Sequence, residues 1–288
     1  MRILSLKISL FLAALLSMNA VLLISANAQE AKRSIEPVTG DVYRFQNNFH
    51  VAMFVVTEDG IVVTDPIDKE AVAWLKEELA GRFGKPVTHM ILSHTHADHA
   101  SGGQEWGQIE VIAHENAATN IKNGAAETAT PTVTFTDTYN FSAGGKTFEL
   151  TYLGKGHGND MIATVVRPEN VGFIVDVVSP KRLPFRDFPG ADIDGYIDQI
   201  AKAESLDFEI LVPGHSGNGT KADAAEAREY MEKLRTGVLQ ALKDGKSVDE
   251  IKSSDLMSEY SSWIAYDDFR ELNIEGMARW LQQTGQAG

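Results

Sequence analysis

Apolar and polar residues alternate along the early part of the chain in a pattern that predicts a β-meander followed by a helix. Three short apolar stretches are separated by turn residues and are typical of strands: 41–47, 50–57 and 61–65. A helix is expected over 68–84, because Val72, Leu75 and Leu79 recur at helical spacing and Gly84 is a typical helix stop. This helix would lead from one strand of a sheet to the next.

The same alternation continues to residue 243, without an internal repeat or a linker rich in proline, glycine or serine. Further strands are expected at 87–93, 110–114, 146–153, 161–167, 171–178 and 208–214. Further helices are expected at 115–123, 192–205 and 221–243, and residues 248–288 are expected to form a helical C-terminal extension packed on the outside. Mixed strands and helices in one chain favour a single layered α/β domain over 29–288.

The first 28 residues have the pattern of a secretory signal peptide. Arg2 and Lys7 precede an apolar run over 8–24, and a small-x-small cleavage site follows at 26–28. An uncleaved membrane anchor is the alternative, because the run approaches the length of a bilayer span. Polar residues interrupt the run, so we expect cleavage and a periplasmic or secreted mature protein without a membrane span.

The mature chain would carry a net charge of −16, since 24 of the 26 basic residues and all 40 acidic residues remain after cleavage. This charge repels phosphate backbones, which argues against a nucleic-acid partner and leaves a small-molecule substrate. The chain contains no cysteine, although an exported protein is free to form disulfides. Any bound metal must therefore be held by nitrogen and oxygen ligands.

Three histidines and an aspartate are crowded into six positions of the stretch "ILSHTHADHASGG". His94, His96, Asp98 and His99 follow an expected strand, at a place where a rigid sheet can aim loop side chains at one point. This set of residues suits zinc or another borderline divalent ion. Without a metal they would leave several polar groups short of partners, which disfavours ordinary surface or core histidines.

The motif resembles the signature of the metallo-β-lactamase superfamily, and three later stretches match the other ligand positions of that family in order. His157 in "GKGHGND" matches the third histidine, Asp176 in "GFIVDVV" the bridging carboxylate, and His215 in "LVPGHS" the final histidine. The resemblance implies a four-layer αββα sandwich, in which helices flank two mixed β-sheets.

The resemblance also implies a site for two divalent ions, with zinc as the expected metal. His94, His96 and His157 would hold one ion, Asp98, His99 and His215 the other, and Asp176 would lie between them. Asp65, at the end of "GIVVTD", either matches the buried aspartate that supports the metal loop in this family or is a simple turn residue.

Two such ions would lower the pKa of a shared water from near 16 to about 7, so that a bridging hydroxide can attack the substrate. Asp98 would orient the hydroxide and pass on a proton, which makes it the predicted catalytic residue. The resemblance thus predicts a zinc-dependent hydrolase of a small ester, lactone, thioester or cyclic amide. Because the chain has no cysteine, it cannot belong with the β-lactamases of this family that use a cysteine ligand. Asp176 points instead to the lactonase, thioesterase, sulfatase and phosphodiesterase relatives. A β-lactam substrate stays open.

Two other functions stay open as well. Mononuclear iron persulfide dioxygenases share much of the motif, whereas oxygen-reducing diiron relatives tend to carry glutamate where His96 stands. A non-catalytic, exported metal-binding accessory protein on the same scaffold is the third hypothesis, although no ligand position is missing.

The segment "SPKRLPFRDFPG" is expected to form an ordered loop over 179–190. Its cations could meet an anionic substrate group or be solvated charges: Lys181, Arg182 and Arg186. Its large apolar residues could line a pocket or pin the loop: Leu183, Phe185 and Phe188. Of the other histidines, His89 is expected near the core and His114 in a structural hydrogen bond, and His50 has no predicted role. The sequence does not identify the substrate.

Overall fold

The computed structural model describes residues 31–287, and the predicted signal peptide lies outside this range. Within it, no helix has both the length and the apolar character needed to cross a membrane. The chain from Lys32 onward forms one structural unit, which contains every candidate site residue.

Seven strands form the first sheet, in the order in which they occur along the chain. They are β1 (Arg33–Thr39), β2 (Val42–Asn47), β3 (His50–Val56), β4 (Ile61–Val63), β5 (Val87–Ile91), β6 (Glu110–His114) and β7 (Val133–Phe135). The strands from β1 to β4 are antiparallel neighbours, and each later strand is parallel to the one before it. The predicted meander therefore continues into a parallel half-sheet.

Six strands form the second sheet, in the order β13-β12-β11-β10-β9-β8. They are β8 (Thr138–Ala143), β9 (Lys146–Tyr152), β10 (Ile162–Arg167), β11 (Val171–Phe173), β12 (Ile210–Val212) and β13 (Gly219–Thr220). All neighbours are antiparallel except β11 and β12. Because β11 and β12 run the same way, the loops that carry Asp176 and His215 begin at the same edge.

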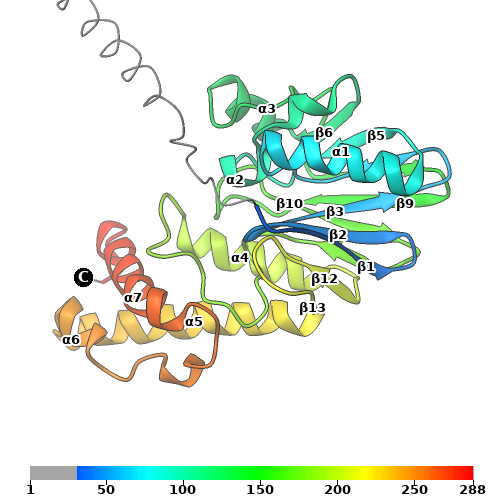
Figure 1. The fold of residues 1–288 in the computed structure, drawn as a ribbon. Helices are drawn as coiled ribbons and strands as arrows, with labels where there is room; N and C mark the ends of the chain where they lie inside the picture. Colours follow the sequence, from blue (N-terminus) through cyan, green and yellow to red (C-terminus); the bar gives the residue numbers. More distant parts are fainter. Residues whose placement is uncertain (1–30, 288) are drawn as a thin grey trace, which may run out of the picture. The chain divides into compact units, whose positions relative to one another are not determined.

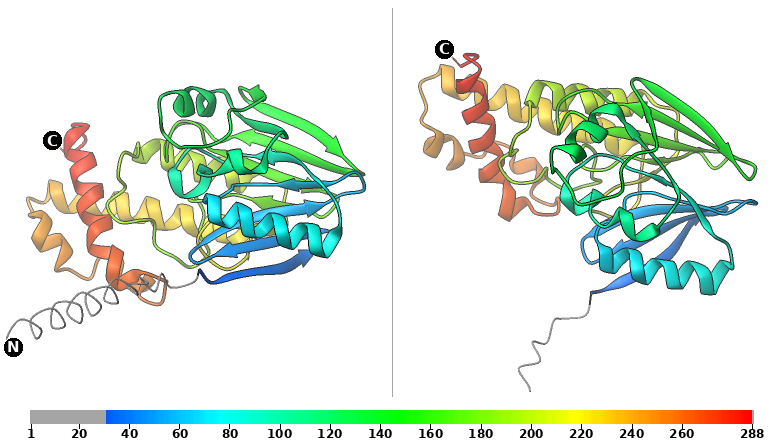
Figure 2. Two further views of the ribbon diagram at one scale, coloured as in Figure 1. Left: turned by 45° about the horizontal axis from the view of Figure 1, so that its top comes forward. Right: turned by 90° about the horizontal axis from the view of Figure 1, so that it is seen from above.

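Helices cover the outer faces of the two sheets, which pack against each other (Figure 1). The helices are α1 (Lys69–Phe83), α2 (Ala97–Ala100), α3 (Glu115–Lys122), α4 (Ile193–Ser205), α5 (Lys221–Lys243), α6 (Val248–Lys252) and α7 (Tyr266–Gln283), with short 3-10 turns at Gly103–Trp106 and Ser258–Tyr260. Helices α1 and α3 pack on the first sheet, and α4 and α5 lie against the second (Figure 2). This arrangement confirms the predicted four-layer sandwich.

Strand β3 shows why the sequence of a central strand is apolar throughout. Val51, Met53 and Val55 belong to the core between the sheets, whereas Ala52 and Phe54 belong to the core beneath α1. Successive side chains of a strand point to opposite faces. A strand that is covered on both faces therefore has no polar positions to alternate with apolar ones.

Edge strands and strand ends differ most from the sequence-based expectation. The apolar pattern missed β1, β7 and β8, because many of their residues are exposed or only half-buried. The stretch expected to be a strand over 171–178 stops at Phe173. The backbone of Asp176 then adopts a left-handed conformation, with φ of 59°. The chain thus leaves the sheet early at the residue predicted to bridge two metals.

The C-terminal extension, which includes α6 and α7, packs beside α5 at one end of the sandwich (Figure 1). The hydroxyl of Tyr230 in α5 donates to Asn273 Oδ1 in α7 at 2.7 Å. Asn273 Nδ2 in turn donates to the backbone carbonyls of Pro184 and Arg186. The extension is helical and external, as expected, and it also holds the 179–190 loop in place.

Replacing Asn273 with alanine should lower the free energy of unfolding by about 3 kcal/mol, because the Tyr230 hydroxyl and two carbonyls lose a buried partner and each such loss costs about 1–3 kcal/mol. Urea denaturation measures the change. Asn140→Ala is the matched control, since Asn140 is an exposed residue of the edge strand β8. Equal stability of the two variants would contradict this role of Asn273.

Candidate metal site

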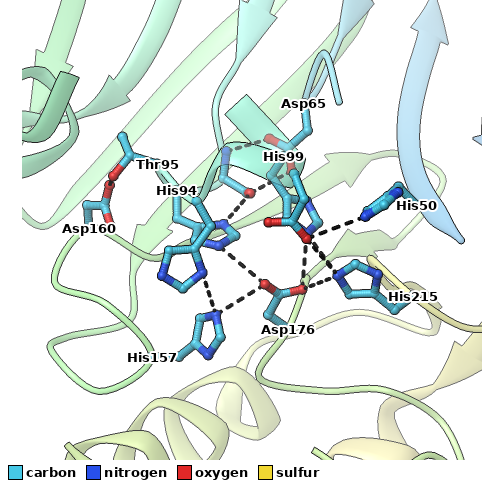
Figure 3. Close-up of polar contacts among 12 residues, drawn as sticks. His50, Asp65, His94, Thr95, His99, His157, Asp160, Asp176 and His215 are labelled. Atoms are coloured by element: carbon cyan, nitrogen blue, oxygen red, sulfur yellow. Dashed lines mark hydrogen bonds and ion pairs between the residues drawn. The ribbon is translucent and has the colours of Figure 1, made fainter. Parts of the chain in front are cut away.

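Seven side chains meet where the loops following four strands converge (Figure 3). We call them the ligand cluster: His94, His96, Asp98, His99, His157, Asp176 and His215. The first four lie on the loop after β5 and on α2, and the others follow β9, β11 and β12. All seven residues predicted to be metal ligands thus come together in space, although they span more than a hundred positions of sequence.

Asp176 lies at the centre of the ligand cluster, and its two carboxylate oxygens face different histidines. Oδ2 lies 3.2 Å from His94 Nε2 and 3.1 Å from His157 Nε2. Oδ1 lies 3.1 Å from the Nε2 atoms of both His99 and His215. One carboxylate therefore connects two separate groups of donor atoms.

Each of these groups is compact enough for a single metal ion. The donor atoms of the first group lie within 4.8 Å of one another, as do those of the second: His94, His96, His157 and Asp176, and His99, Asp176 and His215. Asp98 approaches the second group, with Oδ2 at 3.5 Å from His215 Nε2 and 3.7 Å from His99 Nε2. The cluster thus contains two groups of donor atoms that share Asp176, and Asp98 lies beside the second.

The chemistry of the donor atoms fits a divalent cation. His94 Nε2 and Asp176 Oδ1 are buried and have no hydrogen-bond partner among residues 31–287, and a buried polar atom without a partner is costly. The Nε2 atoms of His99 and His215 lie 3.1 Å apart. Converging nitrogen and carboxylate lone pairs of this kind are the ligands that zinc and similar ions use.

Burial and nearby carboxylates have opposite effects on the protonation of the histidines. It lowers the pKa of His94 to about 4, and it also lowers the pKa of His96, so both imidazoles are neutral as metal ligands must be. For His99, burial also acts to lower the pKa, but the carboxylates of Asp176 and Asp65 outweigh it and raise the pKa well above its usual value. Metal binding at His99 would therefore release a proton.

The carboxylates of Asp98 and Asp176 are ionised. Burial acts to raise the pKa of Asp98, but the hydrogen bond from His50 and the charge of His99 outweigh it and lower the pKa. Burial also acts to raise the pKa of Asp176, but the charge of His99 and the hydrogen bond from His157 to Oδ2 bring it well below the usual value. The cluster therefore carries negative charge that favours a cation.

Asp65 lies buried beneath the ligand cluster and fixes the direction of two ligands (Figure 3). Its Oδ1 accepts the backbone N–H of Ser93 at 2.8 Å, and its Oδ2 lies 2.9 Å from His99 Nδ1. The Ser93 hydroxyl donates to Asp65 and lies 3.0 Å from His94 Nδ1. Since both Nδ1 atoms are occupied in this way, both Nε2 atoms point into the cluster.

Helix α4 holds two of the ligand loops through residues that the sequence analysis did not identify. Tyr196 donates its hydroxyl hydrogen to the backbone carbonyl of Asp176 at 2.7 Å. The fully buried Gln199 accepts the backbone N–H of His157 at 2.6 Å and donates to the carbonyl of Gly154 at 2.7 Å. Residues three apart share a helix face, but this spacing is also that of core residues, so the sequence alone gave no usable signal.

His50 is a further residue whose place in the site was not predicted. It is the first residue of β3, and its Nε2 lies 3.5 Å from Asp98 Oδ2 (Figure 3). His50, Asp98 and His215 form a third group of potential metal donors. The only sequence signal is that His50 starts a strand directly after a turn.

His89 and His114 lie outside the ligand cluster. The ring of His89 stacks on Phe141, with the centroids 5.1 Å apart. His114 Nε2 lies 2.7 Å from the carbonyl oxygen of Thr136, and its Nδ1 accepts the N–H of Asn116. His89 of the first sheet therefore packs on β8 of the second sheet, and His114 makes structural hydrogen bonds, as expected.

A cavity of about 690 Å³ opens beside the ligand cluster. Five cluster members lie on its wall: His96, Asp98, His157, Asp176 and His215. Most of the remaining wall is apolar and includes Phe49, Val177, Leu183, Pro184, Phe185, Phe188, Ile200, Met231 and Trp263. A cavity of this size accommodates a small organic molecule.

The cations of the 179–190 loop have different environments. Lys181 forms an ion pair with Glu226, and Arg186 is exposed and is not part of the cavity wall. Arg182 does line the cavity. The apolar residues of the loop, Leu183 among them, also line it, so the loop contributes both charge and apolar surface to the site.

A family model described as "Metallo-beta-lactamase superfamily" matches residues 47–215, which include the whole ligand cluster and more than half of the chain. The chain belongs to the metallo-beta-lactamase superfamily. Members of this superfamily bind metal ions, and most are hydrolases. The convergence of seven donor residues in one cluster is in keeping with that membership.

Three similar proteins illustrate the range of the superfamily. The alpha subunit of 2,4-dinitroanisole O-demethylase from Nocardioides sp. (strain JS1661) is 25% identical over 260 residues, which cover 85% of this chain and 78% of that protein. Metallo-beta-lactamase type 2 from Bacillus cereus is 28% identical over 178 residues, 57% of this chain and 66% of that protein. The solved metallo-beta-lactamase from Pontibacter korlensis superposes with a TM-score of 0.62 at 20% identity, over 70% of this chain and 99% of that one, which shows a common fold.

Gln199→Leu should weaken metal binding about tenfold to a hundredfold, because the loop that carries His157 loses its hydrogen bond to α4 and second-layer contacts of metal ligands are usually worth that much. Competition with a chromogenic chelator measures the affinity. Gln108→Leu, at an exposed position, should bind metal like the wild type. A folded Gln199→Leu variant with unchanged affinity would show that the hydrogen bond does not support the site.

Proposed function

We propose that the chain is an exported, zinc-dependent hydrolase that cleaves a small ester, lactone, thioester or cyclic amide. The observation that carries the proposal is the position of Asp176, whose two carboxylate oxygens face two different groups of histidines at 3.1–3.2 Å. A carboxylate shared in this way suits a site for two ions, and such sites serve hydrolysis.

The ligand cluster would hold the two ions in the division given above. His94, His96 and His157 would hold one, Asp98, His99 and His215 the other, and Asp176 would contact both. Ions held there would lower the pKa of a bound water to about 7 and would polarise the substrate oxygen. The bound water would thus serve as the nucleophile in a chain that has no cysteine for this role.

Asp98 is the residue of the cluster best placed to handle a proton. Its side chain is 45% exposed, unlike the buried Asp176, and lies on the cavity wall. Asp98 would orient the attacking water and hold the proton that the water loses, and His50 would keep the carboxylate in place through its contact at 3.5 Å. As the water oxygen bonds to the acyl carbon and the bond to the leaving group breaks, Asp98 would return the proton to the leaving group.

The relatives support an acyl or aryl substrate without deciding between them. One relative is named for the demethylation of an aromatic ether and another as a β-lactamase. The cavity beside the cluster has aromatic walls that suit a ring-bearing substrate, including Phe188 and Trp263. Net charge of −14 over the whole chain argues against a nucleic-acid substrate.

Export is inferred from the leader pattern of residues 1–28 and gives a periplasmic or secreted enzyme. N-terminal sequencing of protein from the periplasmic fraction should begin near residue 29. Full-length protein retained with the cells would contradict export and would leave the hydrolase proposal intact.

Chelation should abolish hydrolysis, and added zinc should restore it, because the acidified water depends on the ions. Zinc-loaded protein is assayed on chromogenic lactam, lactone, thioester, phosphodiester, sulfate and aryl ether substrates, with metal content determined in parallel. A metal-loaded protein without activity on any of them would contradict the proposal. Tightly bound iron with oxygen consumption and no hydrolysis would favour the persulfide dioxygenase alternative instead.

Asp98→Asn should lower kcat/KM about a hundredfold to ten-thousandfold while metal still binds, because the amide can neither accept nor return the proton. Asp137→Asn is the control, since Asp137 is exposed and its side chain has no contact with the cluster. Full activity in the Asp98 variant would show that another group handles the proton.

A further inference from the structure

The cavity extends from the ligand cluster along walls that offer mainly apolar surface. Tyr196 and Tyr230 lie on these walls, but the hydroxyl hydrogens of both are already donated, to the Asp176 carbonyl and to Asn273 respectively. The two tyrosines therefore mainly contribute ring surface. Together with Trp263 they would bind an apolar body by burying its surface.

Arg182 differs from every other residue of this wall. Apart from four histidines, it is the one basic side chain among the described residues that line the cavity. Its guanidinium is half-buried, and within residues 31–287 it has neither a hydrogen bond nor an ion pair. Burial lowers the pKa of Arg182, although the nearby charge of Asp268 opposes this. A partly desolvated guanidinium without a hydrogen-bonded partner favours an anion beside it.

The position of Arg182 is fixed by its backbone and by an aromatic ring. The segment around Arg182 pairs with Ile264 in a parallel bridge, in which Leu183 N–H donates to the Ile264 carbonyl at 3.1 Å and Ile264 N–H to the Lys181 carbonyl at 2.8 Å. The guanidinium carbon lies 6.0 Å from the centroid of Phe269 in α7. The C-terminal extension thus holds the guanidinium at the cavity before any ligand arrives.

We propose that the substrate is an amphipathic carboxylic acid, with an apolar ring-bearing or branched body against the cavity wall and a carboxylate on Arg182. This proposal rests on the proposed hydrolase, because it places the bond to be cleaved at the ligand cluster and the carboxylate away from it. A guanidinium binds a carboxylate through two parallel hydrogen bonds, which a neutral amide cannot reproduce.

The overall charge of the protein makes this local cation significant. A chain with a net charge of −14 repels anions at long range. Away from the metal ions, an anionic group of the substrate is therefore accepted where a partly buried cation compensates for its charge, and exposed charges such as Arg186 are largely screened by salt. The alternative is that Arg182 only packs against Phe269 and binds nothing, which the experiment below distinguishes.

The test is calorimetric binding of 4-biphenylacetate and 4-biphenylacetamide to the zinc-loaded protein. The two ligands have the same shape and differ in charge. We expect the carboxylate to bind about tenfold to a hundredfold more tightly than the amide. Arg182→Gln should reduce this ratio to about one, and Arg182→Lys should restore part of it.

Two further variants separate the contributions. Arg186→Gln, on the same loop but outside the wall, should keep the full ratio. Trp263→Ala should weaken both ligands about tenfold and leave the ratio unchanged, because it removes ring surface from the cavity wall and no group that pairs with the carboxylate. Metal content and circular dichroism of each variant establish that the ligand cluster and the fold are intact.

Equal binding of the two ligands by the wild type would overturn the proposal. A ratio that persists in Arg182→Gln would also overturn it, since the carboxylate would then lie on the metal ions. Failure of the hydrolase proposal has a different signature: no substrate of the chromogenic panel is cleaved, while the carboxylate preference and its dependence on Arg182 remain.

Discussion

The carboxylate of Asp176 is the interaction on which the rest of the site depends. It is only 8% exposed and contacts histidines from three different loops at 3.1–3.2 Å. A charge buried this deeply is stable only if every neighbour is held in place. Asp65 does this for the loop after β5, and Tyr196 and Gln199 do it for the loops after β11 and β9. The early end of β11 and the left-handed turn at Asp176 follow from the same requirement.

The metal ligands and part of the cavity wall come from different segments of the chain. The ligand cluster lies within residues 47–215, which the superfamily model matches. Tyr230, Met231 and Trp263 line the cavity from outside that range. Shared chemistry therefore comes with the superfamily, whereas the shape of the cavity depends on α5 and the C-terminal extension. This is the physical reason why relatives named for an ether demethylation and for β-lactam hydrolysis can resemble the same chain.

The sequence predicted the cluster well because each of its residues lies in a recognisable local pattern. His94, His96, Asp98 and His99 are neighbours, and the other three members follow apolar strands. Central strands were also predictable, since burial on both faces removes polar positions. Edge strands β1, β7 and β8 lack that signal. His50 and Gln199 act through contacts with residues 48 and 42 positions away, and such long-range partners have no local signature.

The 179–190 loop shows most directly what tertiary structure adds to sequence. Lys181, Arg182 and Arg186 have the same sign of charge within six positions, and nothing in the sequence distinguishes them. In the fold, Glu226 neutralises Lys181, solvent surrounds Arg186, and only Arg182 is turned into the cavity wall. The bridge to Ile264 holds the backbone of Arg182 at this wall. A change in the C-terminal extension would therefore alter which charge faces the substrate without changing any ligand of the metal site.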